Sequence, residues 1–524
     1  MTLVALMERQ ATANPDRVYF TLYGQPTAYG QFWAMSHRYA GGLAKAGIDQ
    51  GDKVCLVYPT CAEFFYSFFG ALRLGAVPVP LYPTLDPEAM GALLRNSEAK
   101  AVVSIDWFRQ EVEEARAAAA NVAHFLTPSD LEGVDRLPSL PTVRAEDTAF
   151  LQYTSGSTSR PRGVVLSHAN VVGTIEIMAA AVGLASKDTV VSWLPLYHDM
   201  GLIGCCLTPP LVGAKVVLLP PDLRNPRPWL EAITEERGAF TASPDFGYRN
   251  CMRHVKDTAG LDLSSLRLAL SGAEPVRYST IKAFEEKFGL KNVVSPGYGL
   301  AEATLAVAMW PRGEPIRLDP SGRFVSVGKP CRGVSVRITE GETALGPWQE
   351  GEIEVKSPGI MQGYYRDAEA TRRVLRPDGW LRTEDLGLLD AEGNLYVTGR
   401  VKDLIIVAGQ NIAPADIEEM VDQLPGIRYS AAVGIESERL ATQRLHVVAE
   451  VRDTTLDEEA LSRLARAIVQ SVHARCGHRP ARVLLTKPHA VPKTSSGKIQ
   501  RSRLVQMLAG DQLRDQIMYE SGRR

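Results

Sequence analysis

The feature that most constrains this chain is a loop of small and polar residues, Tyr153-Thr-Ser-Gly-Ser-Thr-Ser-Arg-Pro-Arg-Gly163, directly before the apolar run Val164-Val-Leu166. Short side chains let backbone N–H groups approach phosphate oxygens, hydroxyls add donors, and an arginine adds opposite charge. The loop therefore predicts a polyphosphate site before a β-strand, with a Ser/Gly-rich surface linker as the alternative. It is not a Walker loop, because no Gly-Lys-Ser/Thr sequence closes it. The candidate ligands are Thr154, Ser155, Gly156, Ser157, Thr158 and Arg162.

The order of apolar patterns along the chain predicts an α/β fold. Helical spacing alternates with short apolar runs typical of buried strands, which indicates parallel sheets covered on both faces. The expected helices span 29–46, 62–74, 87–96, 110–122, 169–182 and 229–237, and the expected strands span 54–58, 77–81, 102–105, 190–193, 215–219 and 266–270. The prolines of 77–81 make it an edge strand. Between 324 and 355 the pattern is closer to antiparallel β structure.

A second domain is expected near the C-terminus. At 524 residues the chain exceeds what one hydrophobic core normally serves. The pattern changes after Val401, to a β-like run at 404–407, a turn at 409–411 and a helix from Pro414. We therefore expect an N-terminal domain at 1–401 and a smaller α+β domain at 402–524.

Composition and charge argue against several classes of protein. With 45% hydrophobic and 23% charged residues the chain is typical of globular proteins, and a formal net charge of -2 gives no reason to expect nucleic acid as a partner. No uncharged apolar run is long enough to span a bilayer, and the first residues lack a secretory signal pattern. Seven cysteines without metal-site spacing favour free thiols in a reducing compartment. We therefore expect a cytoplasmic protein with no membrane span.

Further motifs follow the phosphate loop in a fixed order: Gly297-Tyr-Gly-Leu-Ala-Glu302, Arg382-Thr-Glu-Asp385, Gly399-Arg-Val-Lys-Asp403 and Pro492-Lys-Thr-Ser-Ser-Gly-Lys498. Together with that loop they resemble the adenylate-forming superfamily, which contains acyl-CoA synthetases, fatty acyl-AMP ligases, luciferases and peptide-synthetase adenylation domains. The resemblance covers essentially the whole chain. It implies a large N-terminal domain of parallel-rich sheets covered by helices, with a β subdomain, that binds ATP and an acyl group. It also implies a small mobile C-terminal lid with its hinge at Lys402.

The reaction that this resemblance implies is attack of a carboxylate on the α-phosphate of ATP, which brings two anions together and needs positioned cations. By resemblance, Lys498 is the lid lysine that reaches the acyl carboxylate and the α-phosphate. Taken alone, a C-terminal lysine is more typical of a solvated surface charge. We interpret Lys493 as such a charge. Glu302 resembles the carboxylate that holds Mg²⁺, with Thr154 as a hydroxyl ligand, and a helix cap is the alternative for Glu302.

Other residues resemble contacts to the adenosine part of the nucleotide. Asp385 resembles the aspartate that accepts the ribose hydroxyls, and Arg400 the arginine that supports the ribose or phosphate. Tyr298 is expected to stack near adenine. The backbone of Gly272, Ala273 and Glu274 and the motif residues Gly299, Leu300 and Ala301 complete the expected nucleotide site.

The chain departs from the family pattern at Ser159, Arg162 and Glu384. Ser159 replaces the middle glycine of the phosphate loop. Arg162 replaces a lysine but keeps the charge and adds bidentate geometry, so we expect phosphate binding to survive. Glu384 stands where glycine is usual and adds a carboxylate beside the nucleotide.

The stretches Ser192-Trp-Leu-Pro-Leu-Tyr-His-Asp-Met-Gly201 and Ser243-Pro-Asp-Phe-Gly247 closely resemble fatty acyl-AMP ligases. This resemblance implies that His198 stands at the junction of an acyl pocket and a thiol tunnel, with a buried core histidine as the alternative. The glycines are expected to leave room for the acyl group. The implied acyl-pocket residues are Trp193, Gly201, Gly204 and Phe246.

One difference in length bears on the acyl acceptor. Fatty acyl-AMP ligases typically carry an extra segment before the ribose aspartate, which obstructs the lid movement needed for CoA, and 363–385 leaves no room for it. We therefore expect a fatty or related acid to be adenylated and then transferred to the thiol of CoA, with Gly409 beside the pantetheine arm. The phosphopantetheine of an acyl carrier protein is the second acceptor. An amine acceptor and a catalytically silent binding protein are the remaining alternatives.

Overall fold

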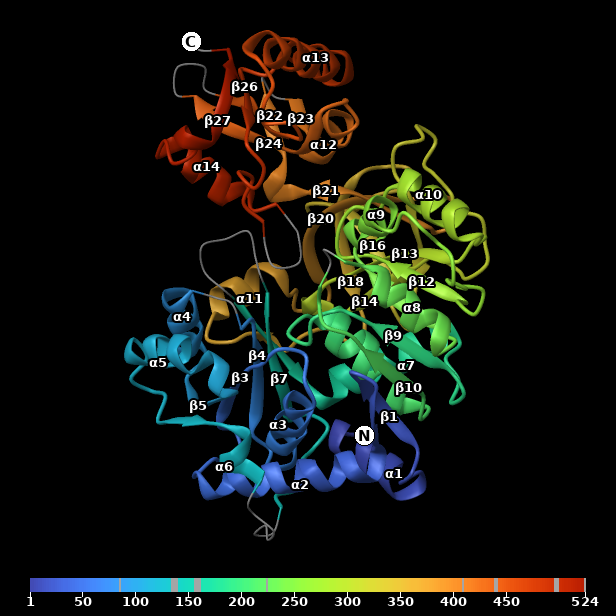
Figure 1. The fold of residues 1–524 in the computed structure, drawn as a ribbon, viewed down its shortest axis with the longest axis vertical. Helices are drawn as coiled ribbons and strands as arrows, with labels where there is room; N and C mark the ends of the chain where they lie inside the picture. The colour runs from blue at the N-terminus through green and yellow to red at the C-terminus, as the bar shows by residue number, and fades with distance from the viewer. Residues whose placement is uncertain are drawn as a thin grey trace.

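Parallel strands alternate with helices in the N-terminal part of the chain, as predicted (Figure 1). The structure is a computed structural model that describes residues 1–83, 86–132, 140–154, 162–222, 225–407, 410–437, 442–493 and 499–522. The first sheet has the all-parallel order β4-β3-β5-β6. Its elements are β3 (Lys53–Val57), α3 (Ala62–Arg73), β4 (Val77–Leu81), α4 (Pro87–Ser97), β5 (Ala99–Ser104), α5 (Arg109–Ala117) and β6 (His124–Leu126). β4 lies at the sheet edge, because Pro78 and Pro80 have no N–H to donate to another strand.

A larger sheet joins parallel strands to an antiparallel extension. Its order is β17-β16-β18-β20-β21-β15-β14-β13-β12-β11-β9-β10-β1-β2. The pairs from β13 to β1 are parallel, and the described pairs from β13 toward β17 are antiparallel, which confirms the expectation for 324–355. The strands are β1 (Val18–Leu22), β2 (Gln25–Ala28), β9 (Thr189–Ser192), β10 (Lys215–Leu218), β11 (Phe240–Ser243), β12 (Leu268–Ser271), β13 (Val294–Gly299), β14 (Ala306–Met309), β15 (Ser326–Pro330), β16 (Ser335–Glu340), β17 (Thr343–Ala344), β18 (Gly351–Lys356), β20 (Leu381–Leu389) and β21 (Leu395–Arg400).

A third, small sheet carries the two ends of the phosphate loop. β7 (Thr148–Thr154) and β8 (Arg162–Ser167) pair antiparallel, with Thr154 opposite Arg162. β19 (Gly363–Tyr364) pairs with the other edge of β8, so that Tyr364 lies opposite Val164. The sheet therefore brings a segment distant in sequence beside the loop.

Helices cover the sheets, and most begin and end close to the predicted positions. The alanine-rich helix expected to reach residue 122 ends earlier, at Ala117 in α5. Asn121 explains the difference, because its Nδ2 donates to the carbonyl oxygens of Leu94 (3.1 Å) and Ala99 (2.8 Å) and holds the chain in a turn. The remaining helices before the lid are α1 (Leu3–Ala13), α2 (Tyr29–Lys45), α6 (Pro128–Glu132), α7 (His168–Val182), α8 (Arg227–Glu235), α9 (Asp245–His254), α10 (Tyr278–Phe288) and α11 (Ala368–Val374).

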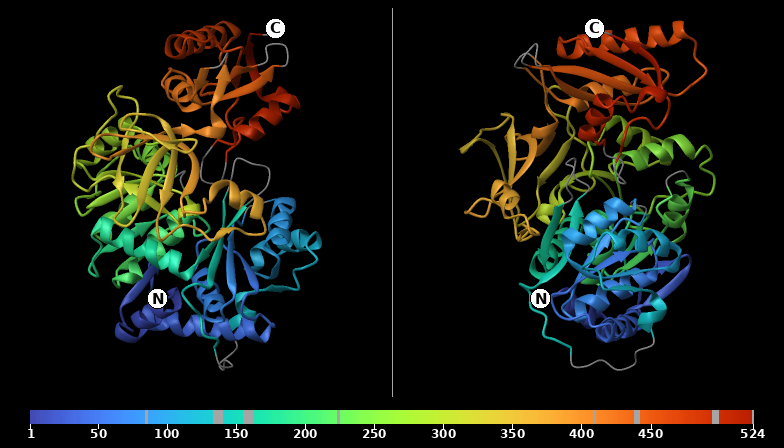
Figure 2. Two further views of the ribbon diagram at one scale, coloured as in Figure 1. Left: turned by 180° about the vertical axis from the view of Figure 1, so that it is seen from behind. Right: turned by 90° about the vertical axis from the view of Figure 1, so that its left-hand side faces the viewer.

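The C-terminal part, which we call the lid, has its own sheet and core and stacks on the end of the body that carries β20 and β21 (Figures 1 and 2). The predicted strand and helix near 404–414 are β22 (Ile405–Val407) and α12 (Pro414–Asp422). The lid sheet has the order β24-β25-β26-β27. Its buried core begins at Ile405, whereas the core of the body ends at Leu395. The other lid elements are β23 (Gln410–Ile412), β24 (Ile427–Ser437), β25 (Thr442–Val451), α13 (Glu458–Cys476), β26 (Arg482–Thr486), α14 (Arg501–Ala509) and β27 (Ile517–Ser521).

Helix α12 attaches the lid to the body through two ion pairs. Arg277 Nη2 lies 3.2 Å from Asp422 Oδ2, and Arg323 pairs with Asp416. Both carboxylates belong to the lid and both guanidinium groups to the body. These pairs therefore depend on the orientation of the lid.

Candidate active site

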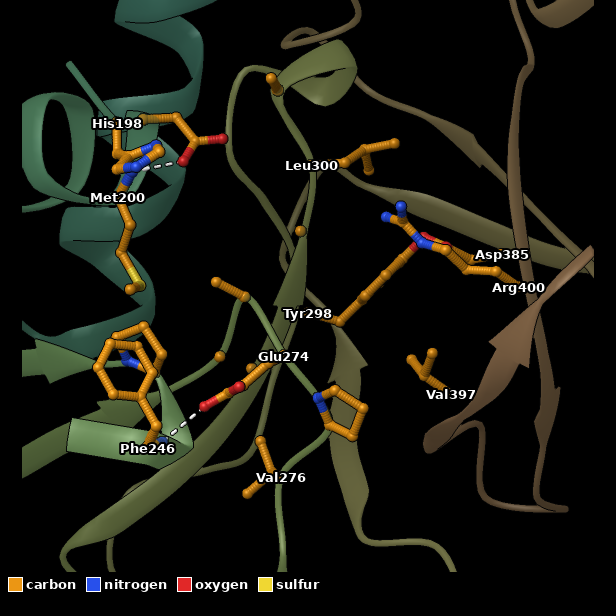
Figure 3. Close-up of a pocket in the computed structure, with 18 of the residues that line it drawn as sticks. His198, Met200, Phe246, Glu274, Val276, Tyr298, Leu300, Asp385, Val397 and Arg400 are labelled. Atoms are coloured by element: carbon orange, nitrogen blue, oxygen red, sulfur yellow. Dashed lines mark hydrogen bonds and ion pairs between the residues drawn. The ribbon is translucent and has the colours of Figure 1, made fainter. Parts of the chain in front are cut away.

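A cavity of about 920 Å³ lies between the lid and the body. Its walls come from the ends of β12, β13, β20 and β21, from the segment after β9 and from α12. Figure 3 shows Asp385 and Arg400 on one side of it and His198, Met200 and Phe246 on the other. The cavity brings together most of the predicted residues, namely Thr154, Arg162, Trp193, His198, Gly201, Phe246, Gly272, Ala273, Glu274, Tyr298, Gly299, Leu300, Ala301, Glu302, Asp385, Arg400 and Lys402.

Asp385, Tyr298 and Arg400 form a hydrogen-bonded group on one wall of the cavity. Asp385 lies opposite Arg400 across β20 and β21. Tyr298 donates its hydroxyl hydrogen to Asp385 Oδ2 (2.7 Å), and Arg400 Nε donates to Asp385 Oδ1 (2.8 Å). The Asp385 carboxylate raises the pKa of Arg400, so the guanidinium stays charged. The two bonds fix the carboxylate that the motifs assign to ribose.

Glu302 lies in a short 3₁₀ turn (Ala301–Ala303) after β13, and its carboxylate has a partner that the sequence did not predict. Tyr364 donates its hydroxyl hydrogen to Glu302 Oε1 at 2.8 Å. The guanidinium carbon of Arg162 lies 5.1 Å from the centre of the Tyr364 ring, within cation–π distance. Burial raises the pKa of Glu302, and the hydrogen bond from Tyr364 opposes that shift. Tyr364 therefore links the carboxylate assigned to Mg²⁺ to the end of the phosphate loop.

The motif glycines are needed where β13 and β12 approach their neighbours. A Cβ at Gly299 would lie 1.6 Å from the carbonyl oxygen of Leu305, and a Cβ at Gly272 would lie 2.9 Å from that of Gly297. The residue after Gly272, Ala273, has φ +67° and lies in the left-handed region. Close backbone packing therefore shapes this wall.

Glu274 turns its side chain toward the acyl side of the cavity. Its Oε1 accepts a hydrogen bond from the backbone N–H of Phe246 at 2.5 Å (Figure 3). Burial, and then the nearby charge of Asp245, raise the pKa of Glu274 to about 7. Arg249 opposes the shift from a distance of 4.0 Å. The Glu274 side chain thus fixes the loop that carries Phe246, and its backbone stays a candidate for nucleotide contact.

The acyl side of the cavity is built by aromatic rings and an unusual helix. The Trp193 and Phe246 rings meet edge to face, with centroids 6.2 Å apart. Met200–Leu207 form a π-helix, which the sequence did not predict and which often marks a functional site. His198 lies just before it, with its ring 4.8 Å from that of Tyr197. The structure thus places His198 on the cavity wall and not in the core.

The two glycines of the π-helix differ in position. Gly201 lines the cavity, and a Cβ there would lie 2.3 Å from the carbonyl oxygen of Pro195. Gly204 is not among the residues that line the described cavity, contrary to expectation. It faces Leu305 and Met178, because the three residues from Gly201 are less than one turn of the π-helix and place it on another face.

The departure at Glu384 has a local explanation. Glu384 has φ +59°, in the left-handed region where glycine is favoured. Its carboxylate pairs with Lys402 Nζ at 2.5 Å, on the segment expected to be the hinge. The added acid is therefore bound to Lys402 and not to Arg400, which pairs with Asp385.

Some predicted residues lie outside the described residues: Ser155, Gly156, Ser157, Thr158, Ser159, Gly409 and Lys498. The flanks of the lysine loop are described, and Lys493 and Ile499 form an antiparallel bridge. Ile499 and Arg501 line the cavity. The described residues directly after 494–498 therefore lie at the cavity.

Two further properties of the described residues bear on the site. They contain no group of three or more His, Cys, Asp or Glu side chains arranged to hold a metal ion. A metal bound at Glu302 would thus take most of its ligands from substrate or water. Among the described helices, none is both long and apolar enough to cross a membrane.

The cavity combines the two described ends of the Ser/Gly-rich loop, an aspartate held by two hydrogen bonds and an apolar wall, as the motifs of an adenylate-forming enzyme predict. Residues 7–365 match the family model described as AMP-binding enzyme. The chain belongs to this family and is a ligase that uses ATP to adenylate a carboxylic acid.

Individual relatives cover nearly the whole chain. It is 32% identical to "Long-chain-fatty-acid--AMP ligase FadD26" of Mycobacterium marinum over 97% of both chains. It is also 32% identical to "Medium-chain-fatty-acid--[acyl-carrier-protein] ligase JamA" of Moorena producens, over 87% of this chain and 85% of that protein. A solved structure from work on fatty acyl-adenylate ligases from E. coli and L. pneumophila has a TM-score of 0.88 at 30% identity, over 98% of both chains.

Proposed function

We propose that this enzyme adenylates a fatty or related carboxylic acid and then transfers the acyl group to the phosphopantetheine thiol of CoA. In this proposal residues 1–401 bind ATP and the acid, and residues 402–524 form a lid that turns about Lys402. The observation that carries it is the single cavity in which Asp385 and Arg400 face an apolar pocket with His198 and Phe246 at its wall. An acyl-adenylate has a polar nucleotide end and an apolar acyl end that match these two sides.

In the first step, the chain must hold a triphosphate and a carboxylate together. Thr154 and Arg162 frame the phosphate loop, and Arg162 supplies charge to it. Asp385 accepts the ribose hydroxyls, held in place by Tyr298 and Arg400. Lys498 neutralises charge between the acid and the α-phosphate, and Ile499, the residue after it, lines the cavity.

Mg²⁺ fits the residues present, since Mg²⁺ is commonly bound by one or two carboxylates together with phosphate oxygens and water. Glu302 would hold it, with Thr154 as a hydroxyl ligand. When bound, the ion would neutralise phosphate charge during displacement of pyrophosphate. Tyr364 keeps the Glu302 carboxylate oriented toward the cavity through its 2.8 Å hydrogen bond.

CoA is the preferred acceptor because of how α11 connects to β20. α11 ends at Val374 and β20 begins at Leu381, so little chain stands between them. The alignment with the M. marinum relative runs over 575 positions, whereas this chain has 524 residues, so the relative carries residues that are absent here. A lid without an obstructing segment can turn to admit a pantetheine arm. Gly409 is our candidate for the tunnel.

An acyl carrier protein is the second candidate acceptor. The relative from M. producens is named for a carrier-protein ligase activity, and it matches 87% of this chain. Both acceptors present the same thiol on a phosphopantetheine arm. They differ in whether protein contacts outside the cavity contribute to binding.

The test is to incubate the enzyme with ATP, Mg²⁺ and a panel of fatty and aromatic acids. CoA, a phosphopantetheinylated carrier protein, an amine or no acceptor is then added. Release of AMP and the product mass are measured. We expect acid-dependent AMP release and an acyl-CoA thioester. If adenylate accumulates and CoA does not accelerate turnover while the carrier protein does, the acceptor is the carrier protein. If no acid gives adenylate, the substrate proposal is wrong.

A further inference from the structure

The segment that joins the body to the lid changes its contacts between two adjacent residues. Lys402 Nζ lies 2.5 Å from Glu384 Oε2, on strand β20 of the body. Asp403, the next residue, pairs instead with Arg501 of helix α14 in the lid, at 3.0 Å. Lys402 is therefore bound to the body, and its neighbour is bound to the lid.

The backbone around Glu384 is held in one conformation by neighbouring polar groups. Glu384 has φ +59°, in the left-handed region where glycine is favoured. Its N–H donates to Glu352 Oε1 at 3.2 Å, and Arg382 Nη2 donates to the other oxygen of Glu352 at 2.6 Å. The hydroxyl of Thr383 donates to the carbonyl oxygen of Ile353 at 2.8 Å. These bonds fix the direction in which the Glu384 side chain leaves the strand.

The strained backbone at Glu384 carries a side chain with a specific partner. Glycine, which is usual at this position in the family pattern, would adopt φ +59° without strain but would leave Lys402 without this carboxylate. Strained residues that neighbouring bonds hold in place are typical of switch regions. The contact with Lys402 is thus what the glutamate adds in place of glycine.

We propose that Glu384 is a positioning residue that holds Lys402, and with it the lid, in the orientation in which Ile499 and Arg501 line the cavity. This inference rests on the proposed function, because it needs the lid to turn about Lys402 between the two steps. Ile499 directly follows Lys498, so this orientation is the one for adenylate formation. A change in φ at Lys402 swings its side chain away from Glu384. The ion pair therefore favours adenylate formation and delays acyl transfer.

The exposure of the pair sets the size of the effect. The side chains of Glu384 and Lys402 are 38% and 44% exposed, so water and salt weaken their attraction. Loss of the pair should therefore shift the balance between the two lid orientations by about twofold to fivefold. The shift should become smaller at high ionic strength.

The kinetic test compares single-turnover rates of adenylate formation and of acyl transfer from preformed adenylate to CoA or to a phosphopantetheinylated carrier protein. E384Q should raise the ratio of the transfer rate to the adenylation rate about twofold to fivefold at low salt. E384G should do the same, and its backbone fits the left-handed conformation without strain. E342Q breaks an exposed pair with Arg376 inside the body, and as the matched control it should leave the ratio unchanged.

Removing the partner cation separates this role from a direct effect of the Glu384 charge on ATP. Loss of an acid and loss of a base change the potential at the phosphates in opposite directions, whereas both break the pair. K402Q should therefore raise the ratio as E384Q does, and the double substitution should raise it no further. Opposite effects of E384Q and K402Q, or an unchanged ratio in both, would overturn the proposal.

The lid orientation is measured independently of catalysis by the distance between two spin labels. The labels are introduced as unnatural amino acids at the exposed positions Glu369 of α11 in the body and Glu459 of α13 in the lid. E384Q should increase the population at a second distance about twofold to fivefold relative to the first. Identical distance distributions in the unmodified enzyme and E384Q would also overturn the proposal. If no acid gives adenylate, the proposed function fails while the distances still decide the role of Glu384.

Discussion

At the scale of single residues, the site depends on contacts that hold carboxylates in place before substrate arrives. Tyr364 is the clearest case, because its hydroxyl binds the Glu302 carboxylate at 2.8 Å while Arg162 lies against its ring. A hydrogen bond to a charged group contributes about 1.5–3 kcal/mol. The Tyr364 hydroxyl therefore orients Glu302.

We predict that Tyr364→Phe lowers kcat/KM for adenylation about tenfold to a hundredfold, the kinetic equivalent of that hydrogen bond. The Mg²⁺ concentration for half-maximal activity should rise, which loss of stability alone would not cause. The measurement is pyrophosphate exchange against Mg²⁺ concentration. Tyr365→Phe is the matched control, because its hydroxyl binds Glu98 away from the site. Equal Mg²⁺ requirements in the two variants would contradict the orienting role.

A second prediction concerns the pH dependence of stability at Glu274. Its pKa is raised from 4.5 to about 7, so the folded state binds the proton more tightly than the unfolded state does. The contribution of this group to the free energy of unfolding is thus complete below about pH 4.5. It falls by roughly 1–3 kcal/mol as the pH rises to about 7. Asp245, Arg249 and Arg277 are the charges that face it.

Glu274→Gln should remove this loss. Urea unfolding at pH 5 and pH 8 measures the free energy of unfolding of both proteins. The difference, variant minus unmodified protein, should be larger at pH 8 than at pH 5 by roughly 1–3 kcal/mol. Glu369→Gln changes an exposed carboxylate and should show no such gain. A difference between Glu274→Gln and the unmodified protein that is the same at both pH values would show that burial does not raise this pKa.

At the scale of elements, the π-helix Met200–Leu207 shapes the acyl side of the cavity. Its extra residue per turn lets the Thr208 N–H reach the carbonyl oxygen of Ile203. The turn before it brings Gly201 so close to Pro195 that no side chain fits. The geometry of the helix start thus depends on one glycine.

We predict that Gly201→Ala destabilises the protein by about 1–3 kcal/mol and raises KM for the acid, because its Cβ would lie 2.3 Å from a backbone oxygen. Gly204→Ala is the matched control in the same helix. Its Cβ would lie 3.2 Å from the movable Leu305 side chain, so we expect a much smaller effect. Denaturant unfolding and acid titrations measure both, and equal effects would refute the distinction.

At the scale of the whole molecule, two ion pairs hold the lid on the body in this orientation. Arg277 and Asp422 are partly buried, so removing one partner leaves a charge without compensation. The proposed rotation of the lid about Lys402 would separate the residues of each pair. We therefore expect the pairs to favour one step of the proposed reaction over the other.

We predict that Arg277→Gln or Asp422→Asn slows adenylate formation about threefold to tenfold and leaves transfer from preformed adenylate unchanged or faster. The double substitution should slow adenylate formation no more than either single substitution does. A double-mutant cycle of single-turnover rates measures this. Arg482→Gln breaks a similar pair, Arg482–Glu520, inside the lid, and should leave the balance between steps unchanged. Equal slowing of both steps by Arg277→Gln would exclude a role in lid orientation.

Much of the fold and part of the site follow from the sequence because the signals are local. Apolar periodicity predicts β3, α3 and α12 without reference to distant residues. The motifs at 297–302 and 382–385 single out Glu302 and Asp385 through their resemblance to the adenylate-forming family, and both residues line the cavity. The end of α5 was predicted wrongly because Asn121 bonds across to other elements.

The sequence by itself determined the class of reaction, through the order of its motifs, and the alternation of strands and helices. Only the tertiary structure decided that Tyr364 meets Glu302 across 62 residues and that Glu384 pairs with Lys402. The physical reason is that a periodic pattern records how one segment buries its apolar face, whereas a contact between polar groups depends on which surfaces the finished packing brings within hydrogen-bond distance.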